Sequence, residues 1–140
     1  MVSKQEQFNR GLIIALFLSS IVGLLLEILG QFICLVFASS PTDLHYTYVS
    51  YISLTTLGHG NIFPFAVVIA SLSLSVILLV ELLAKRNLFR ARCIACICIL
   101  ALNAIPYAIG FLRLTIGAVI IEVLYALLLV LQCIIERKAK

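Results

Sequence analysis

Charged residues are scarce in this 140-residue sequence. Asp, Glu, Lys and Arg make up only 11% of it, whereas about a quarter of the residues in a soluble domain are charged. Hydrophobic residues make up 64%, and the mean hydropathy is +1.22. A soluble fold of this length would leave many leucines in contact with water, whereas lipid is as apolar as those side chains. The composition therefore excludes an ordinary soluble domain and predicts a single integral membrane domain over residues 1–140.

The residue sets that catalysis and metal binding require are also missing. The sequence has only two histidines, no serine or cysteine nucleophile beside either, no phosphate-binding loop and no haem or zinc spacing. Four of the five cysteines have no histidine near them in the sequence: Cys93, Cys96, Cys98 and Cys133. Buried cysteine is a common small hydrophobic residue. We therefore expect no enzymatic activity, no metal site and no cofactor.

Long apolar runs are what the sequence has in abundance. They cover residues 11–37, 65–84, 93–111 and 114–135. About 20 apolar residues in a helix cross the hydrocarbon layer of a bilayer. Because the runs lack the period-two alternation of a barrel strand, and a backbone in lipid must satisfy its own hydrogen bonds, we expect helices. The predicted fold is an all-α integral membrane protein with four transmembrane helices.

The basic residues orient these four spans. Nine of the ten lie before the first span, between the second and third, or after the fourth: Lys4, Arg10, Lys85, Arg86, Arg90, Arg92, Arg137, Lys138 and Lys140. With four spans these positions lie on one side of the membrane, and the positive-inside rule makes that side cytoplasmic. Both termini are then cytoplasmic, and residues 38–64 lie on the outer side. The net charge of +4 is explained by topology and anionic lipid headgroups, so no nucleic-acid partner is expected.

The stretch 41–64 is neither a long apolar run nor a charged connector. Residues 39–43, Ser-Ser-Pro-Thr-Asp, are typical of a helix start. Apolar and aromatic residues then recur at helical spacing: Leu44, Tyr48, Tyr51 and Ile52. These features predict a short helix of about three turns that ends near Leu54. Such a helix is too short to cross the bilayer, so we expect it to be re-entrant or interfacial.

Residues 55–64 read Thr-Thr-Leu-Gly-His-Gly-Asn-Ile-Phe-Pro. A cation filter needs successive backbone carbonyls that face one axis. Gly58 and Gly60 stand at the spacing where such a loop needs positive φ, and Thr56 adds a hydroxyl oxygen. The alternative is a glycine-containing turn between two membrane segments. The motif together with its position between two spans favours a filter-like pore loop.

This motif resembles the filter of the potassium-channel pore-loop family, whose usual form is Thr-Thr-Val-Gly-Tyr-Gly-Asp-x-x-Pro. The resemblance covers about residues 11–84 and implies an outer helix, a pore helix, a filter and an inner helix in a homotetramer. It also implies that a monovalent cation such as K⁺ binds at the filter positions, which are Thr56, Leu57, Gly58, His59 and Gly60, with Thr55 and Asn61 as supports. His59 and Asn61 depart from the usual aromatic residue and Asp. The function that the resemblance implies is a potassium-conducting cation channel.

Polar residues inside the predicted spans form a second candidate site. Three of them fall at similar depth from the outer side, Glu27, Asn103 and Glu122, and Gln31 lies one helical turn from Glu27 on the same face. Polar groups at such depth normally face protein and find partners there. One interpretation is a proton or cation site inside the bundle. The other is a structural hydrogen-bond cluster that clamps the first, third and fourth helices.

Two other patterns concern the second span. Ser71 and Ser75 share a helix face, and they either line a cavity or pack against a neighbour. Glu81 and Lys85 stand four residues apart, which predicts an ion pair at the helix end.

The second hypothesis for function is a non-conducting four-helix membrane protein. It would be an accessory subunit of a larger complex or an immunity-type protein that binds a toxin in the membrane. Its partners would then be other membrane proteins, bound through the polar cluster or the outer loop. A fourfold assembly favours the channel, whereas a monomer or a mixed complex favours the second hypothesis.

Overall fold

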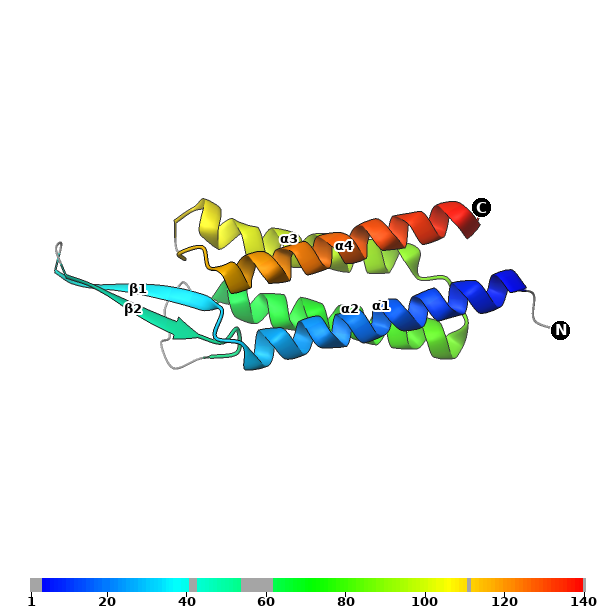
Figure 1. Cartoon of the computed structure of the whole chain (residues 1–140), viewed down its shortest axis with the longest axis horizontal. Helices are drawn as coiled ribbons and strands as arrows, with labels where there is room; N and C mark the ends of the chain where they lie inside the picture. Colours follow the sequence, from blue (N-terminus) through cyan, green and yellow to red (C-terminus); the bar gives the residue numbers. More distant parts are fainter. Residues whose placement is uncertain (1–3, 41–42, 54–61, 111, 140) are drawn as a thin grey trace.

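The computed structural model describes residues 4–40, 43–53, 62–110 and 112–139. The elements, in chain order, are α1 (Lys4–Leu29), β1 (Ile33–Ser40), β2 (Asp43–Val49), α2 (Ile62–Ala84), α3 (Phe89–Ala108) and α4 (Ile116–Ala139). The four helices lie alongside one another, and the β1–β2 hairpin projects from one end (Figure 1). We call this the hairpin end. The start of α1 and the end of α4 lie at the opposite, basic end.

All four helices are long and apolar enough to cross a membrane. Their membrane-crossing segments are Arg10–Leu29, Ile62–Ala84, Phe89–Ala108 and Ile116–Arg137. This confirms the prediction of an integral membrane protein with four helical spans. Helix α2 begins before the predicted residue 65 because proline is tolerated in the first turn, so Pro64 does not delay the start. Helix α3 begins at Phe89, within the basic connector.

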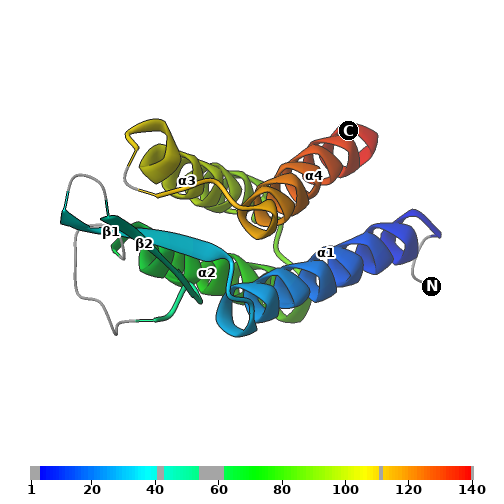
Figure 2. The same ribbon diagram turned by 60° about the vertical axis from the view of Figure 1, so that its left-hand side comes forward.

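The helices form two layers around an apolar core. Figure 2 shows α1 and α2 in one layer and α3 and α4 in the other. Each helix packs against two neighbours, in the pairs α1–α2, α2–α3, α3–α4 and α1–α4. The core side chains come from all four helices and include Leu16, Leu74, Leu78, Ile99 and Ile121. Large apolar side chains on the outer faces are exposed, as expected for surfaces that contact lipid.

The first predicted span, 11–37, is wrong at its end. Helix α1 stops at Leu29, and residues 33–40 form strand β1. The Gly30 backbone N–H donates to the Leu26 carbonyl at 2.8 Å. A side chain at position 30 would have its Cβ 2.5 Å from the Phe32 ring. That Cβ would also lie 2.6 Å from the Leu26 backbone carbonyl oxygen, so the close packing where the chain leaves α1 requires glycine.

The predicted short helix between 41 and 54 is also wrong, because residues 43–49 form strand β2. Strands β1 and β2 pair antiparallel from Ile33↔Val49 to Ser40↔Asp43. The segment Leu-His-Tyr-Thr-Tyr-Val is rich in aromatic and β-branched residues, which favour a strand when a partner strand lies beside it. The helical spacing of its apolar residues was therefore outweighed by pairing with β1. The strand-forming residues of β1 had been counted as part of the first span.

The root of the hairpin is fixed to the bundle. Ile33, Cys34 and Leu35 are buried. The Arg113 backbone N–H, in the connection between α3 and α4, donates to the Cys34 carbonyl at 3.3 Å. The hydroxyl of Thr115 donates to the carbonyl of Phe32. These contacts attach β1 to the start of α4, so the hairpin has a defined direction relative to the helices.

Candidate functional site

The structure divides the predicted polar cluster into two hydrogen-bonded groups in the half of the bundle nearer the hairpin. The first group centres on Asn103 of α3. Its Nδ2 donates to Oε2 of Glu122 at 2.7 Å, and its Oδ1 accepts from the hydroxyl of Tyr51 at 2.9 Å. Nδ2 also lies 3.4 Å from the carbonyl oxygen of Ala118. The pairing of Asn103 with Glu122 joins α3 to α4.

The second group centres on Glu27 of α1, which is 0% exposed. The Ser71 hydroxyl donates to its Oε1 at 2.8 Å. The hydroxyl of Tyr125 lies beside the same carboxyl group. Oε2 of Glu27 is buried and accepts no hydrogen bond of ordinary geometry from the described residues. Residues from α1, α2 and α4 therefore meet around one carboxyl group.

Gly23 makes room for this arrangement. A Cβ at position 23 would lie 2.8 Å from the hydroxyl oxygen of Tyr125. Carbon and oxygen atoms that are not bonded do not approach so closely, so a larger residue would displace the tyrosine. Gly23 is one helical turn before Glu27, and its missing side chain lets the Tyr125 hydroxyl reach that level of α1.

Tyr51 connects the two groups. Its backbone N–H donates to the Glu27 carbonyl at 3.2 Å, and its hydroxyl donates to Asn103. Its side chain is 1% exposed, and this burial raises the pKa of the Tyr51 hydroxyl above its ordinary value. The hydroxyl therefore stays protonated and remains a hydrogen-bond donor. The helical spacing in the sequence placed Tyr51 on a helix face and did not reveal this role, because the contact depends on the hairpin.

Gln31 does not belong to the cluster. The prediction placed it one helical turn from Glu27, but α1 ends at Leu29 and Gln31 lies beyond it. It lines an open cleft at the base of the hairpin instead. The correction follows from the turn at Gly30, because the spacing that places residues i and i+4 on one face holds only within a helix.

Ser71 and Ser75 of the second span face α1. The Ser75 and Ser20 hydroxyl oxygens lie 3.1 Å apart, and Ser71 bonds to Glu27. Ser75 also donates to the backbone carbonyl of Ser71 at 3.1 Å. Of the two interpretations of Ser71 and Ser75, the contacts therefore fit packing against a neighbouring helix.

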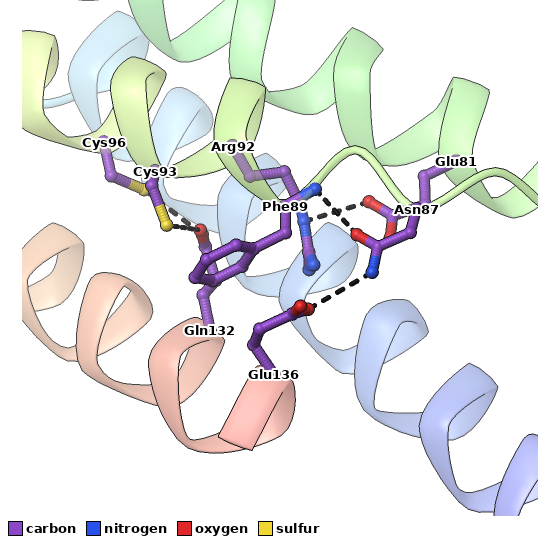
Figure 3. A network of polar contacts seen from close by, with 8 residues as sticks. All are labelled: Glu81, Asn87, Phe89, Arg92, Cys93, Cys96, Gln132 and Glu136. Carbon is purple, nitrogen blue, oxygen red and sulfur yellow. Dashed lines mark hydrogen bonds and ion pairs between the residues drawn. The ribbon is translucent and has the colours of Figure 1, made fainter. Parts of the chain in front are cut away.

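A third polar group, shown in Figure 3, lies toward the basic end. Nε of Arg92 is 2.9 Å from Oε2 of Glu81, and the two side chains are 2% and 5% exposed. The predicted pairing of Glu81 with Lys85 is therefore wrong, because Glu81 pairs with Arg92. Lys85 has a φ of 53° and comes directly after the last residue of α2, so it lies outside the helix in which the spacing would hold.

Other polar contacts extend this group to α4. Nε2 of Gln132 lies 3.2 Å from the sulfur of Cys96, and the sulfur of Cys93 lies 3.8 Å from Oε1 of Gln132. Nδ2 of Asn87 donates to Glu136 at 3.2 Å (Figure 3). Within the described ranges, no group of three or more His, Cys, Asp or Glu residues is placed to hold a metal ion.

Arg92 and Gln132 are buried, which the sequence pattern did not reveal. Arg92 was counted with the exposed basic connector, and Gln132 was not singled out. One signal in the sequence could have indicated buried partners. Glu81 and Gln132 are polar residues inside predicted apolar spans, where polar side chains need partners.

The predicted filter lies outside the described residues. This applies to every position of the motif: Thr55, Thr56, Leu57, Gly58, His59, Gly60 and Asn61. Comparison of the chain with protein-family models, curated proteins and solved structures found no match. Function is therefore inferred from the contacts and surfaces of the chain itself.

Proposed function

We propose that this chain is a non-conducting membrane protein that uses its hairpin to bind another protein on the outer side. The observation that carries the proposal is the β1–β2 hairpin, which projects beyond the ends of the helices (Figure 1). Its exposed side chains include Val36, Tyr46 and Tyr48. Exposed aromatic residues on a projecting element are typical of protein interfaces.

The orientation follows from the basic residues. Arg10 lies in the first half of α1, Lys85 and Arg86 directly follow α2, and Arg137 lies in the last turn of α4. The start of α1 and the end of α4 lie at the end of the bundle opposite the hairpin (Figure 1). By the positive-inside rule this end faces the cytoplasm, so the hairpin and any partner that it binds lie outside.

The exposed edge of β2 supports a particular binding mode. Among the described residues the sheet has two strands, and the isolated bridge from Cys34 to Arg113 lies on β1. Strand β2 therefore has one edge with no neighbouring strand from the described part of the chain. Such an edge binds extended segments of other chains by backbone hydrogen bonds. We infer that the partner contributes an extended segment that pairs with β2.

The contacts inside the bundle fit a structural role for the polar residues. Glu27 bonds to Ser71, Glu81 pairs with Arg92, and Asn103 bonds to Glu122. These contacts connect α1 to α2, α2 to α3, and α3 to α4 within one chain. The bundle therefore serves as a rigid base for the hairpin, and of the two interpretations of the polar cluster this supports the structural clamp.

Site-specific crosslinking tests the proposal. A photo-crosslinking amino acid at Thr47, which is exposed on β2, is expected to give one discrete adduct with a second protein in intact cells. The same group at Leu83, which is exposed on α2, is the control, because a residue facing lipid is expected to give no adduct of that mass. Equal adducts at both positions, or none at Thr47, would contradict the proposal.

The second candidate is the pore-loop cation channel, supported by the filter-like sequence of residues 55–61. It requires a fourfold assembly in mild detergent and K⁺ flux in vesicles that Gly58→Ala abolishes. That result would replace the proposed function. A monomer or mixed complex that carries no flux would exclude the channel, because one loop cannot surround an ion. The channel candidate is weakened because residues 43–49 form strand β2 and not a pore helix. These residues therefore supply no helix dipole directed at the filter.

A further inference from the structure

The base of the hairpin contains an open cleft of about 380 Å³. It lies where α1 has ended and α4 begins, which is the level at which lipid headgroups meet these spans. Its walls come from the turn after α1, from both strands and from the connection that leads into α4. Its lining residues include Gln31, Phe32, Tyr48, Arg113 and Thr115.

The shape of the cleft depends on Phe32. A Cβ at Gly117 would lie 2.2 Å from the Phe32 ring, so only glycine admits the ring at the start of α4. The Thr115 hydroxyl donates to the Phe32 carbonyl and accepts from the backbone N–H of Ala118, the latter at 3.1 Å. The cleft is thus built by specific contacts between the hairpin root and α4.

The charge of the cleft favours an anion. Arg113 is the one basic residue of the ten that the predicted topology places on the hairpin side of the membrane, and none of the described residues that line the cleft is acidic. Its guanidinium carbon lies 5.0 Å from the centre of the Tyr46 ring. Stacking on an aromatic ring uses the face of the guanidinium group and leaves its N–H edge available for hydrogen bonds. A phosphate group matches that edge in charge and geometry.

An apolar groove of about 300 Å³ lies along the last turns of α1 and the residue that follows them. Its lining residues are all from α1 or the residue after it: Val22, Leu25, Leu26, Leu29 and Gly30. Gly30 directly precedes Gln31 and Phe32 of the cleft. The groove runs along the part of α1 that spans the membrane, so it extends from headgroup level into the hydrocarbon layer. A ligand that fills both sites has an anionic head and an apolar chain.

We propose that the cleft and the groove together bind one anionic phospholipid of the outer leaflet. Its phosphate lies at the N–H edge of Arg113, and Gln31 adds a polar side chain beside the head. One acyl chain follows the groove along α1. The bound lipid fills the space below the hairpin and supports its orientation, which is a role separate from the binding of a partner protein.

The test measures lipid retained by the purified full-length chain in mild detergent, using native mass spectrometry. We expect retention of added phosphatidylglycerol in preference to phosphatidylcholine, and no competition by inorganic phosphate. Arg113→Gln is expected to lower phosphatidylglycerol retention about tenfold, because a charge-assisted hydrogen bond is lost. Arg113→Lys keeps the charge and is expected to restore part of the retention. The matched control is Arg86→Gln, which removes the same charge from an exposed residue at the basic end.

A second pair of variants tests the groove. Leu25→Trp fills it and is expected to reduce retention of phosphatidylglycerol, whereas Leu18→Trp changes an exposed residue of α1 outside the groove and is expected to have no effect. The proposal is wrong if both phospholipids bind equally, if Arg86→Gln acts as strongly as Arg113→Gln, or if inorganic phosphate displaces the lipid. Because no partner protein is present, this result is independent of the crosslinking experiment.

Discussion

At the scale of single residues, the stability of the bundle depends on polar side chains that find partners away from water. Arg92 and Glu81 illustrate the point, because each would be a buried unpaired charge without the other. Burying an ion pair costs desolvation energy, and breaking one by removing a single partner leaves that cost uncompensated. The packing of the bundle also depends on Gly23, because Tyr125 occupies the space that a side chain at this position would fill.

Arg92→Ala is expected to destabilise the chain by about 3–5 kcal/mol, because Glu81 then remains buried without its partner. The double variant Glu81→Leu, Arg92→Met removes both charges and is expected to recover most of that loss. The control is Lys85→Ala, which removes the exposed cation that sequence analysis paired with Glu81 and is expected to have little effect. Thermal or denaturant unfolding in detergent measures all three. Equal losses for Arg92→Ala and Lys85→Ala would show that the pairing is wrong.

Gly23→Ala is expected to destabilise the chain by about 1–3 kcal/mol, because its Cβ would overlap the Tyr125 hydroxyl. Tyr125→Phe removes the overlapping oxygen, so in that background Gly23→Ala is expected to cost less. Gly11→Ala is the control, since a Cβ there meets no atom within 4 Å. Unfolding midpoints of the four variants in detergent check the result. An undiminished cost in the Tyr125→Phe background would contradict it.

At the scale of elements, pairing between two segments determined that the chain between α1 and α2 forms the strands β1 and β2. Residues 33–40 are as apolar as a helix end, and residues 43–49 carry a helical spacing of apolar residues. Each segment is ambiguous by itself. Together they form an antiparallel ladder whose root is held by Arg113 and Thr115.

The register of the hairpin predicts where an engineered cysteine will form a disulfide with Cys34. Cys34 lies opposite Tyr48 in the ladder, and both side chains line the same cleft. In Tyr48→Cys the two sulfur atoms are expected to come within bonding reach, because directly opposed residues of antiparallel strands have Cβ atoms about 4.5–5.5 Å apart. Oxidation should then remove two thiols from the count obtained by alkylation and mass spectrometry. In the control Thr47→Cys the new residue lies opposite Leu35 and points to the other face of the hairpin. Equal disulfide formation in both variants would argue against this register.

At the scale of the whole molecule, the four spans place the start of α1 and the end of α4 at one end of the bundle and the hairpin at the other (Figure 1). The lipid-facing surface is apolar on every helix, and the basic residues concentrate at one end. By the positive-inside rule, this polarity predicts the orientation in the membrane and therefore the side on which the hairpin is available.

The orientation is testable with a thiol reagent that does not cross membranes. On intact cells, His45→Cys is expected to be labelled, because position 45 is exposed on the hairpin. Arg86→Cys is expected to be labelled only after permeabilisation, because position 86 is exposed at the basic end. The unsubstituted chain, which has five cysteines, gives the background. Labelling of Arg86→Cys alone on intact cells would reverse the orientation.

The sequence by itself determined the membrane class, the four helical spans and the presence of costly polar residues at Glu27, Asn103 and Glu122. These features follow from the composition and length of single segments, which do not depend on what lies opposite them. Only the tertiary structure decided that residues 33–49 form a hairpin, that Glu81 pairs with Arg92, and that Tyr51 replaces Gln31 in the polar cluster. In each case the residues contact one of several possible partners, and distance in space decides which one. A change of chain direction, such as the one at Gly30, alters those distances without changing the local sequence pattern.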